Sequence, residues 1–293
     1  MTVGLLLQAT VLGILTGGLY ALMASGLTLV FGVMDIINVA QGAFVVLGAY
    51  LSFELQQRVG LDPILGLLIT IPIMFLLGLV LEVAFIRPLK KDRTQLSILV
   101  TYAIAIIIEG TLNNAFSPNL VKIQAWYTTA SIPMLGFYLP VSYLLAFGLS
   151  VVLLSALYYL LYRTTFGRSV RASMQNRVAA QLVGIDVERV SALTFAIGVS
   201  LTAAGGMAYG LINQFNAASH LDLISRLLVI IVLGGMGSLG GALVASVAML
   251  VIEDITAAFW SPTWASTVFF ALLVLLLLVR PQGLFGKLAT RSQ

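Results

Sequence analysis

Two amide side chains are the residues of this sequence best suited to contact a small polar solute. Asn38 and Gln41 lie three positions apart in the segment DIINVAQGAFVVLGAY, so a helix would place both on one face. Gly42 follows them and would allow a second segment to approach that face closely. Such a face suits the path of a polar solute, and it suits equally well a hydrogen bond between two packed helices.

The ionisable residues of the apolar segments are candidates for a second kind of site. Glu109 lies deep within an apolar run, where a carboxylate is costly unless it is paired or hydrated. It would line an aqueous cavity or else lie at an interface. We expect His220, the single histidine, at an outer helix end, and we expect Asp222 and Arg226 to pair across one helical turn.

Familiar catalytic motifs are missing or out of context. Residues 235–240, GMGSLG, match the dinucleotide-binding fingerprint, but that motif needs a parallel sheet and an acidic residue about 20 positions later, and the sequence offers neither. No G-x-x-x-x-G-K-[ST] phosphate loop occurs, so this chain cannot hydrolyse ATP by that route. With no cysteine and one histidine, a soft-ligand zinc site cannot be assembled. We predict no catalytic site, no metal site and no cofactor bound by this chain, which is therefore not an enzyme.

The composition indicates the solvent that surrounds these residues. Only 9% of them are charged, against about 25% in an ordinary soluble domain, and 60% are hydrophobic. The mean hydropathy is +1.07. A soluble fold of 293 residues lacks the interior to bury so much apolar surface. The composition therefore predicts a membrane protein, excludes a soluble enzyme or a disulfide scaffold, and argues against a nucleic-acid partner.

The apolar stretches have the length of membrane-spanning helices, which need about 20 residues each. They lie at residues 5–31, 40–57, 63–86, 95–116, 137–162, 190–212, 221–257 and 264–280. Runs such as VSYLLAFGLSVVLLSALYYLLY lack the alternation of polar and apolar residues that is typical of barrel strands. We predict an all-α, polytopic membrane bundle, with one transmembrane domain over residues 1–293.

Positive charge is concentrated in three segments. Twelve of the fifteen Lys and Arg residues lie within residues 87–93, 163–189 and 280–291. Because basic residues near span ends are retained in the cytoplasm, we place these segments there and the sparsely charged loops outside. The N-terminus then lies outside and the C-terminus in the cytoplasm.

The number of crossings between two cytoplasmic segments must be even, yet three apolar stretches lie between residues 189 and 280. We interpret 221–257 as broken, because its centre holds five helix-destabilising glycines between Gly234 and Gly241. It would form a re-entrant pair or two short spans, and discontinuous helices often line transport paths. The same glycines would alternatively allow close helix packing. The candidate path residues are therefore Asn38, Gln41, Gly42, Glu109, Gly235, Gly237 and Gly240.

The basic loop at 163–189 carries a helical pattern. Apolar residues recur every four positions, at Val170, Met174, Val178 and Leu182. This spacing predicts a short amphipathic cytoplasmic helix, with Gly184 as its left-handed C-terminal cap and Ile185 as the hydrophobic contact that follows. Such a helix would lie on lipid headgroups, anchored by its arginines, or would dock into a groove on a cytoplasmic partner.

Several motifs resemble those of the branched-chain amino acid (leucine, isoleucine and valine) permeases of ABC importers. The segment RASMQNRVAAQLVGIDVERV carries the A-A-x-x-x-G core of the coupling loop, and FAIG, AAGGMAYG, LGGMGSLGGALVA and RPQGLFG follow it. The N-terminal GGLYALMASGLTLVFGVMDIINVAQGAFVVLGAY fits the same family. The resemblance therefore covers nearly the whole chain.

This resemblance implies an importer that works by alternating access in a bacterial inner membrane. Its partners would be a second related permease, two ATPase subunits that bind ATP and Mg²⁺, an extracytoplasmic substrate-binding protein and membrane lipid. The residues implied to reach the ATPase groove are Ala179, Ala180, Leu182, Gly184 and Ile185. Many importers open this motif with a glutamate, which is Val178 here, so Arg171 or Arg177 would supply a polar contact instead.

Two alternatives stay open. Related permeases serve urea, short amides or aromatic acids, and the sequence does not separate these solutes from branched-chain amino acids. A stand-alone channel or ion-coupled carrier would ordinarily hold charged relays deep inside its spans, whereas most acidic residues here lie near span ends.

Overall fold

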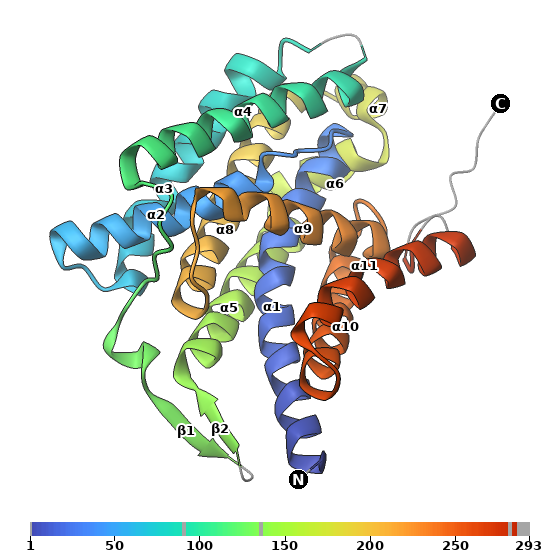
Figure 1. The fold of residues 1–293 in the computed structure, drawn as a ribbon. Coiled ribbons are helices and arrows are strands. Elements are labelled where there is room, and N and C mark those ends of the chain that lie inside the picture. The colour runs from blue at the N-terminus through green and yellow to red at the C-terminus, as the bar shows by residue number, and fades with distance from the viewer. Residues whose placement is uncertain (1, 90–91, 135–136, 281–282, 286–293) are drawn as a thin grey trace.

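The computed structural model of this chain describes residues 2–89, 92–134, 137–280 and 283–285. It is a bundle of helices with one short hairpin, which lies at the same end of the molecule as the N-terminus (Figure 1). The basic residues Lys90, Lys91, Lys287 and Arg291, the C-terminus and part of the RPQGLFG motif lie outside the described residues.

The helices are α1 (Thr2–Met34), α2 (Gln41–Val59), α3 (Pro63–Leu81), α4 (Arg93–Phe116), α5 (Val141–Arg163), α6 (Thr165–Gln175), α7 (Arg177–Leu182), α8 (Val187–Ile212), α9 (His220–Gly234), α10 (Leu239–Phe259) and α11 (Pro262–Val279). Helix α3 continues into a π-helical turn, Glu82–Ile86, and 3-10 turns occupy Trp126–Thr128 and Ala217–Ser219. Strands β1 (Ser131–Met134) and β2 (Phe137–Pro140) pair antiparallel, with Ser131 opposite Pro140 and Met134 opposite Phe137.

Among the described residues, eight helices are long and apolar enough to cross a membrane: α1, α3 with its π-turn, α4, α5, α8, α9 with its preceding turn, α10 and α11. They confirm the predicted all-α membrane bundle. Helix α2, which we predicted as a further span, is long enough to cross but less apolar than these eight helices, because its last turns contain Glu54, Arg58 and two glutamines. It is enclosed by protein at its start, where nine of its first ten residues are buried.

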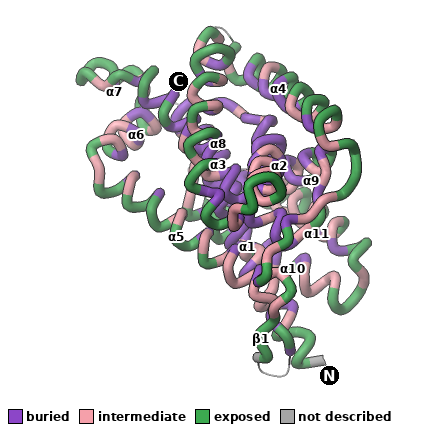
Figure 2. The backbone as a smooth tube through the Cα atoms, turned by 90° about the vertical axis from the view of Figure 1, so that its left-hand side faces the viewer, coloured by how far each residue is buried: buried purple, intermediate pink, exposed green. Residues whose placement is uncertain are grey.

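Helix α8 forms the core of the bundle and is buried along most of its length, with α1, α2 and α3 packed against it. A Cβ added to Gly198 would lie 2.9 Å from the Gly26 carbonyl oxygen of α1, and one added to Gly206 would overlap the Val45 carbonyl oxygen of α2. Small residues therefore bring backbones into direct contact, as is usual in membrane bundles. Figure 2 shows the buried residues gathered at the centre of the bundle, whereas α7 is largely exposed.

The helices run between two ends of the molecule. Helices α6 and α7 lie at one end, and the N-terminus, the hairpin and the α10–α11 turn lie at the other (Figure 1). Arg93 of the first basic segment lies near Arg177 of the second, so both segments belong to the α6–α7 end, which we call the basic end. This distribution of charge agrees with the predicted cytoplasmic placement, and the orientation itself stays a prediction.

The predicted break at the central glycines is confirmed. Helix α9 ends at Gly234 and α10 begins at Leu239, while Gly235 (φ 91°) and Gly237 (φ 82°) adopt left-handed backbone that reverses the chain. Both helices are long and apolar enough to cross a membrane, which favours two short spans. The turn packs against Gly32 near the end of α1, which places it at the basic end and not at mid-depth.

A second break, at residues 35–40, does lie inside the bundle. This non-helical segment joins α1 to α2 and follows α4 inward, since the Thr94 hydroxyl donates to the Asp35 carbonyl oxygen (2.9 Å) and the Val39 amide donates to the Thr101 hydroxyl (3.0 Å). Ile36 and Asn38 are fully buried. Helix α2 therefore begins in the interior, where threonines of α4 satisfy the backbone that precedes it.

The contact between α2 and α8 predicts that Gly→Ala substitution lowers thermal stability at Gly206 but not at Gly110. Gly206→Ala places a methyl group on the Val45 carbonyl, so we expect a clear fall in the thermal unfolding midpoint of the detergent-solubilised protein. Gly110→Ala is the matched control, because no atom lies within 4 Å of its added Cβ and alanine favours a helix by about 1 kcal/mol. Equal midpoints for the two variants would contradict the packing described.

Candidate functional site

Asn38 and Gln41 meet in a buried polar cluster between α2 and α8. Both are fully buried. The Asn38 amide donates to the Gln41 side-chain oxygen (3.0 Å), and the Gln41 amide donates to the Thr202 hydroxyl. Thr202 in turn donates to the Gly198 carbonyl oxygen (2.8 Å). In this conformation Gln41 bridges α2 and α8, which was the second of the two roles predicted for these amides, and Asn38 holds the Gln41 side chain.

Gly42 connects this cluster to the start of α9. A Cβ on Gly42 would overlap the His220 carbonyl oxygen, so α2 and α9 touch there. The His220 ring nitrogen Nε2 lies 2.9 Å from a Glu109 carboxylate oxygen of α4. His220 lies at a helix end, as expected, but it is only 2% exposed and not at an interface, and the partner that stabilises it lies 111 positions away in sequence.

The glycine candidates lie elsewhere. Gly235 and Gly237 form the α9–α10 turn at the basic end, and Gly240 lies in the first turn of α10, where an added Cβ would meet open space. The seven candidate path residues therefore form two groups, one around the Gln41 cluster and the start of α9, the other at the α9–α10 turn. The structure does not bring them into one site.

The predicted coupling helix is two helices. Asn176 (φ −157°) interrupts the helical backbone after α6, and its side-chain oxygen accepts a hydrogen bond from the Ala179 amide (3.0 Å), which caps α7. The C-terminal cap is confirmed: Gly184 has φ 87°, its amide donates to the Gln181 carbonyl, and the Ile185 amide donates to the Ala180 carbonyl, both at 3.0 Å. These paired bonds form a Schellman motif and make α7 a short, closed unit.

The kink at Asn176 changes which side chains are exposed. Val170 is buried, as expected for an apolar face, but Val178 is 65% and Leu182 83% exposed. The exposed apolar surface of this unit, which we call the α7 tip, consists of Val178, Ala179, Leu182 and Val183. The prediction of one continuous apolar face is wrong, because the helix axis changes direction between Met174 and Val178.

The other predicted coupling residues lie behind the α7 tip. Ala180 is buried and Ile185 partly buried, so both hold α7 on the bundle, while Gly184 is exposed. Arg171 donates to the Leu161 carbonyl oxygen, and its guanidinium lies 4.9 Å from the centre of the Tyr162 ring. Its charge is thus engaged by α5, whereas Arg177 is partly exposed at the start of α7.

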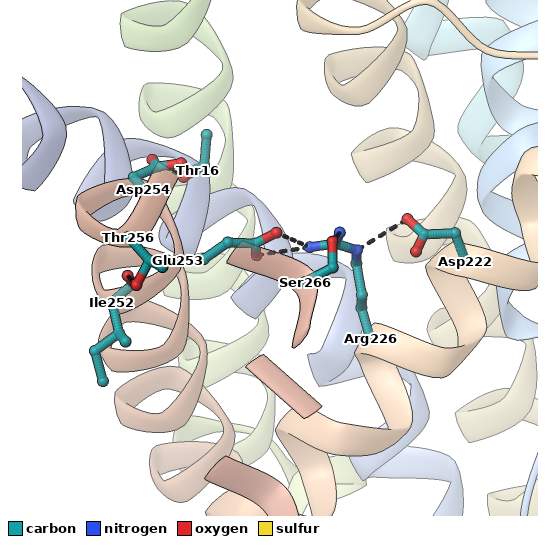
Figure 3. A network of polar contacts seen from close by, with 8 residues as sticks. All are labelled: Thr16, Asp222, Arg226, Ile252, Glu253, Asp254, Thr256 and Ser266. Atoms are coloured by element: carbon teal, nitrogen blue, oxygen red, sulfur yellow. Dashed lines mark hydrogen bonds and ion pairs between the residues drawn. The ribbon is translucent and has the colours of Figure 1, made fainter. Parts of the chain in front are cut away.

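An ion-pair network on α9, α10 and α11 was only partly foreseen. Arg226 donates to Asp222 (2.9 Å), as predicted, but also to both carboxylate oxygens of Glu253 (2.5 and 2.6 Å) and to the Ser266 hydroxyl (3.2 Å), as Figure 3 shows. Arg226 belongs to α9, and its side chain is only 13% exposed. The spacing of four residues indicated Asp222, whereas no sequence signal indicated Glu253.

This network predicts that replacing Arg226 alone destabilises the protein more than replacing Arg226 and Glu253 together. Arg226→Met should lower the free energy of unfolding by about 3 kcal/mol, because Glu253 is left buried without its partner. Replacing Glu253 by Met as well should recover most of that loss. Unfolding in mixed detergent micelles measures both.

The control for these variants is Arg58→Met, because Arg58 is largely exposed in its pair with Glu54. We expect this change to lower the free energy of unfolding by less than about 1 kcal/mol. A double variant no more stable than Arg226→Met alone would contradict the prediction.

Comparison with known proteins gives consistent matches. The family model described as "Branched-chain amino acid transport system / permease component" matches residues 9–278. The high-affinity branched-chain amino acid permease protein LivH of Salmonella typhimurium is 28% identical over 96% of both chains. The probable LivH of Methanocaldococcus jannaschii is 27% identical over 93% of this chain and 90% of its own.

A more distant relative is the permease protein LivM of Escherichia coli, which is 25% identical over 94% of this chain and 69% of its own. No solved structure matches significantly. Because the family model covers nearly the entire bundle from α1 to α11, this chain belongs to the permease family of branched-chain amino acid ABC transport systems.

Proposed function

We propose that this chain is one permease subunit of an ATP-driven, binding-protein-dependent importer of branched-chain amino acids that works by alternating access. The observation that carries the proposal is the α7 tip. Together with the family membership, it supplies a surface to which an energy-supplying partner could bind.

The α7 tip has the properties of a docking element. Val178, Leu182 and Val183 are 65–83% exposed at the end of the molecule that is rich in arginine. Caps at both ends of α7 hold these side chains in a fixed arrangement, so little conformational freedom is lost on binding. A rigid apolar helix of this kind fits a hydrophobic groove on a protein.

The alternative of a helix lying on lipid headgroups fits less well. A membrane-surface helix needs a continuous apolar face flanked by basic residues. Here α7 has one basic residue, Arg177 in its first turn, and Arg171 is engaged with α5. Docking into a partner therefore accounts better for the exposure of the α7 tip.

The partners follow from what this chain lacks. No phosphate loop occurs in its sequence, so ATP and Mg²⁺ would be bound by two ATPase subunits that receive the α7 tips of two permeases. The match to LivM, a permease of the same kind of system, supports a related second permease over a second copy. A substrate-binding protein would deliver the amino acid from outside a bacterial inner membrane.

Docking of the α7 tip predicts a charge-sensitive contact. Leu182→Asp would place a carboxylate in an apolar groove, so we expect the ATPase subunits co-purified with the permease to fall about tenfold, with membrane insertion unchanged. Thr165→Asp, an exposed change of equal charge on α6, is the matched control.

The backbone of Gly184 provides an independent variant. Gly184→Val should uncouple ATP hydrolysis from uptake, because a β-branched residue is strained at φ 87°. Normal transport by both Leu182→Asp and Gly184→Val would rule out docking through α7. Uptake by the permease alone, without ATPase subunits, would favour a channel or carrier.

The proposed orientation can be tested directly because the chain has no cysteine. Tyr138→Cys in the hairpin and Gln181→Cys in α7 change exposed residues at opposite ends of the molecule. A membrane-impermeant maleimide added to intact cells should label the hairpin variant only, and both after the membrane is opened. Labelling of the α7 variant in intact cells would reverse the orientation.

A further inference from the structure

Met174 lies where three elements meet at the basic end. It belongs to the last turn of α6, and its terminal methyl group occupies the space that a side chain on Gly32 of α1 would fill. A Cβ on Gly32 would also lie 3.6 Å from the Gly237 Cα of the α9–α10 turn. One flexible side chain of α6 thus touches α1 directly beside the turn that joins α9 to α10.

Helix α6 is attached firmly to α5 at its other end. A Cβ on Gly167 would overlap the carbonyl oxygens of Leu160 and Leu161, so the first turn of α6 rests directly on the α5 backbone. The Thr164 hydroxyl accepts a hydrogen bond from the Gly167 amide (3.0 Å), and Arg171 donates to Leu161. Helices α5 and α6 therefore form one mechanical unit, which ends at Met174 and Gln175, directly before the kink at Asn176.

A second unit lies on the other side of Met174. Helix α1 packs backbone to backbone on α10, since a Cβ on Gly13 would lie 2.5 Å from the Val251 Cα. The α9–α10 turn is fastened to the segment after α11, because the Leu284 amide donates to the Leu233 carbonyl oxygen (2.7 Å). A displacement at Gly32 and Gly237 would thus reach α1, α9, α10 and the end of α11 together.

We propose that the Met174 side chain, seated on Gly32 beside Gly237, is the contact through which a movement of α7 reaches α1 and the α9–α10 turn. This inference rests on the proposed function and deepens it. Met174 is a positioning residue: it touches neither solute nor nucleotide, and it fixes how α6 bears on the second unit. A thioether side chain suits this role, because it keeps contact while the surfaces on either side of it shift.

The test uses the assembled complex of this permease with its partner subunits in proteoliposomes, with uptake and ATP hydrolysis measured in the same vesicles. For Met174→Ala we expect ATP hydrolysis to stay within about twofold and uptake per ATP hydrolysed to fall about fivefold or more. Met174→Leu, which preserves the volume, should retain coupling. Met236→Ala is the matched control. Met236 lies beside Gly237 in the α9–α10 turn, but it is half exposed.

A steric exchange sharpens the test. Gly32→Ala adds a methyl group where Met174 lies, so it should reduce coupling as Met174→Ala does. Combining Gly32→Ala with Met174→Ala restores the fit, and the double variant should recover at least half of the lost coupling. If uptake per ATP hydrolysed falls in the double variant by the product of the two single-variant decreases, the inference is overturned.

Two outcomes separate this inference from the function on which it rests. If wild-type complexes transport normally and Met174→Ala lowers only the unfolding midpoint, with uptake per ATP unchanged, Met174 is a packing residue and the inference fails alone. If the wild-type complex takes up no solute when ATP is hydrolysed, the proposed function and the inference fail together.

Discussion

Direct contact between helix backbones is the constraint on which this structure depends. Lipid is as apolar as a leucine side chain, so helices gain little from burying apolar surface against one another and associate through close packing. Helix α8 provides the surface for that packing: α1 approaches it at Gly198 and α2 at Gly206. Because α2 is held this closely it lies inside the bundle, and the Gln41–Thr202 hydrogen bond follows from its position.

The two interruptions of helical backbone are satisfied in different ways, and this difference fits their locations. The segment at 35–40 is buried, so its amides and carbonyls need partners from α4, which Thr94 and Thr101 supply. The α9–α10 turn lies at the basic end and is closed locally, with Ser238 capping α10 through the Gly241 amide (3.1 Å). The first interruption fixes α2 in the interior, whereas the second presents a surface to α1.

The sequence was informative where the signal is local, and it failed where partners are distant. The approximate extents of the long apolar helices, the break between Gly234 and Leu239 and the Gly184 cap each depend on a few neighbouring residues and were predicted correctly, except that residues 137–140 form strand β2 and not the start of α5. The Glu109–His220 and Arg226–Glu253 contacts join residues 111 and 27 positions apart, and nothing in one sequence specifies such pairs. The division of α6 from α7 was missed because apolar periodicity continues through Asn176, although the side-chain cap that begins α7 overrides it.

These contacts decide which parts of the bundle can move under the proposed function. Exposing Gln41 to solvent would break its bond to Thr202 and would also separate α2 from α8, where an added Cβ on Gly48 would overlap Ala203. In these buried surroundings an unpaired polar group costs several kcal/mol, and the packing between the two helices would be lost as well. We therefore expect α2 and α8 to shift as one body. The α6–α7 pair differs, since Asn176 interrupts the helix between them and most of the α7 surface is exposed. Under the proposed function, motion driven from the basic end would therefore begin at α7, and Asn38 and Gln41 would influence the path by holding the core rigid while the helices around it rearrange.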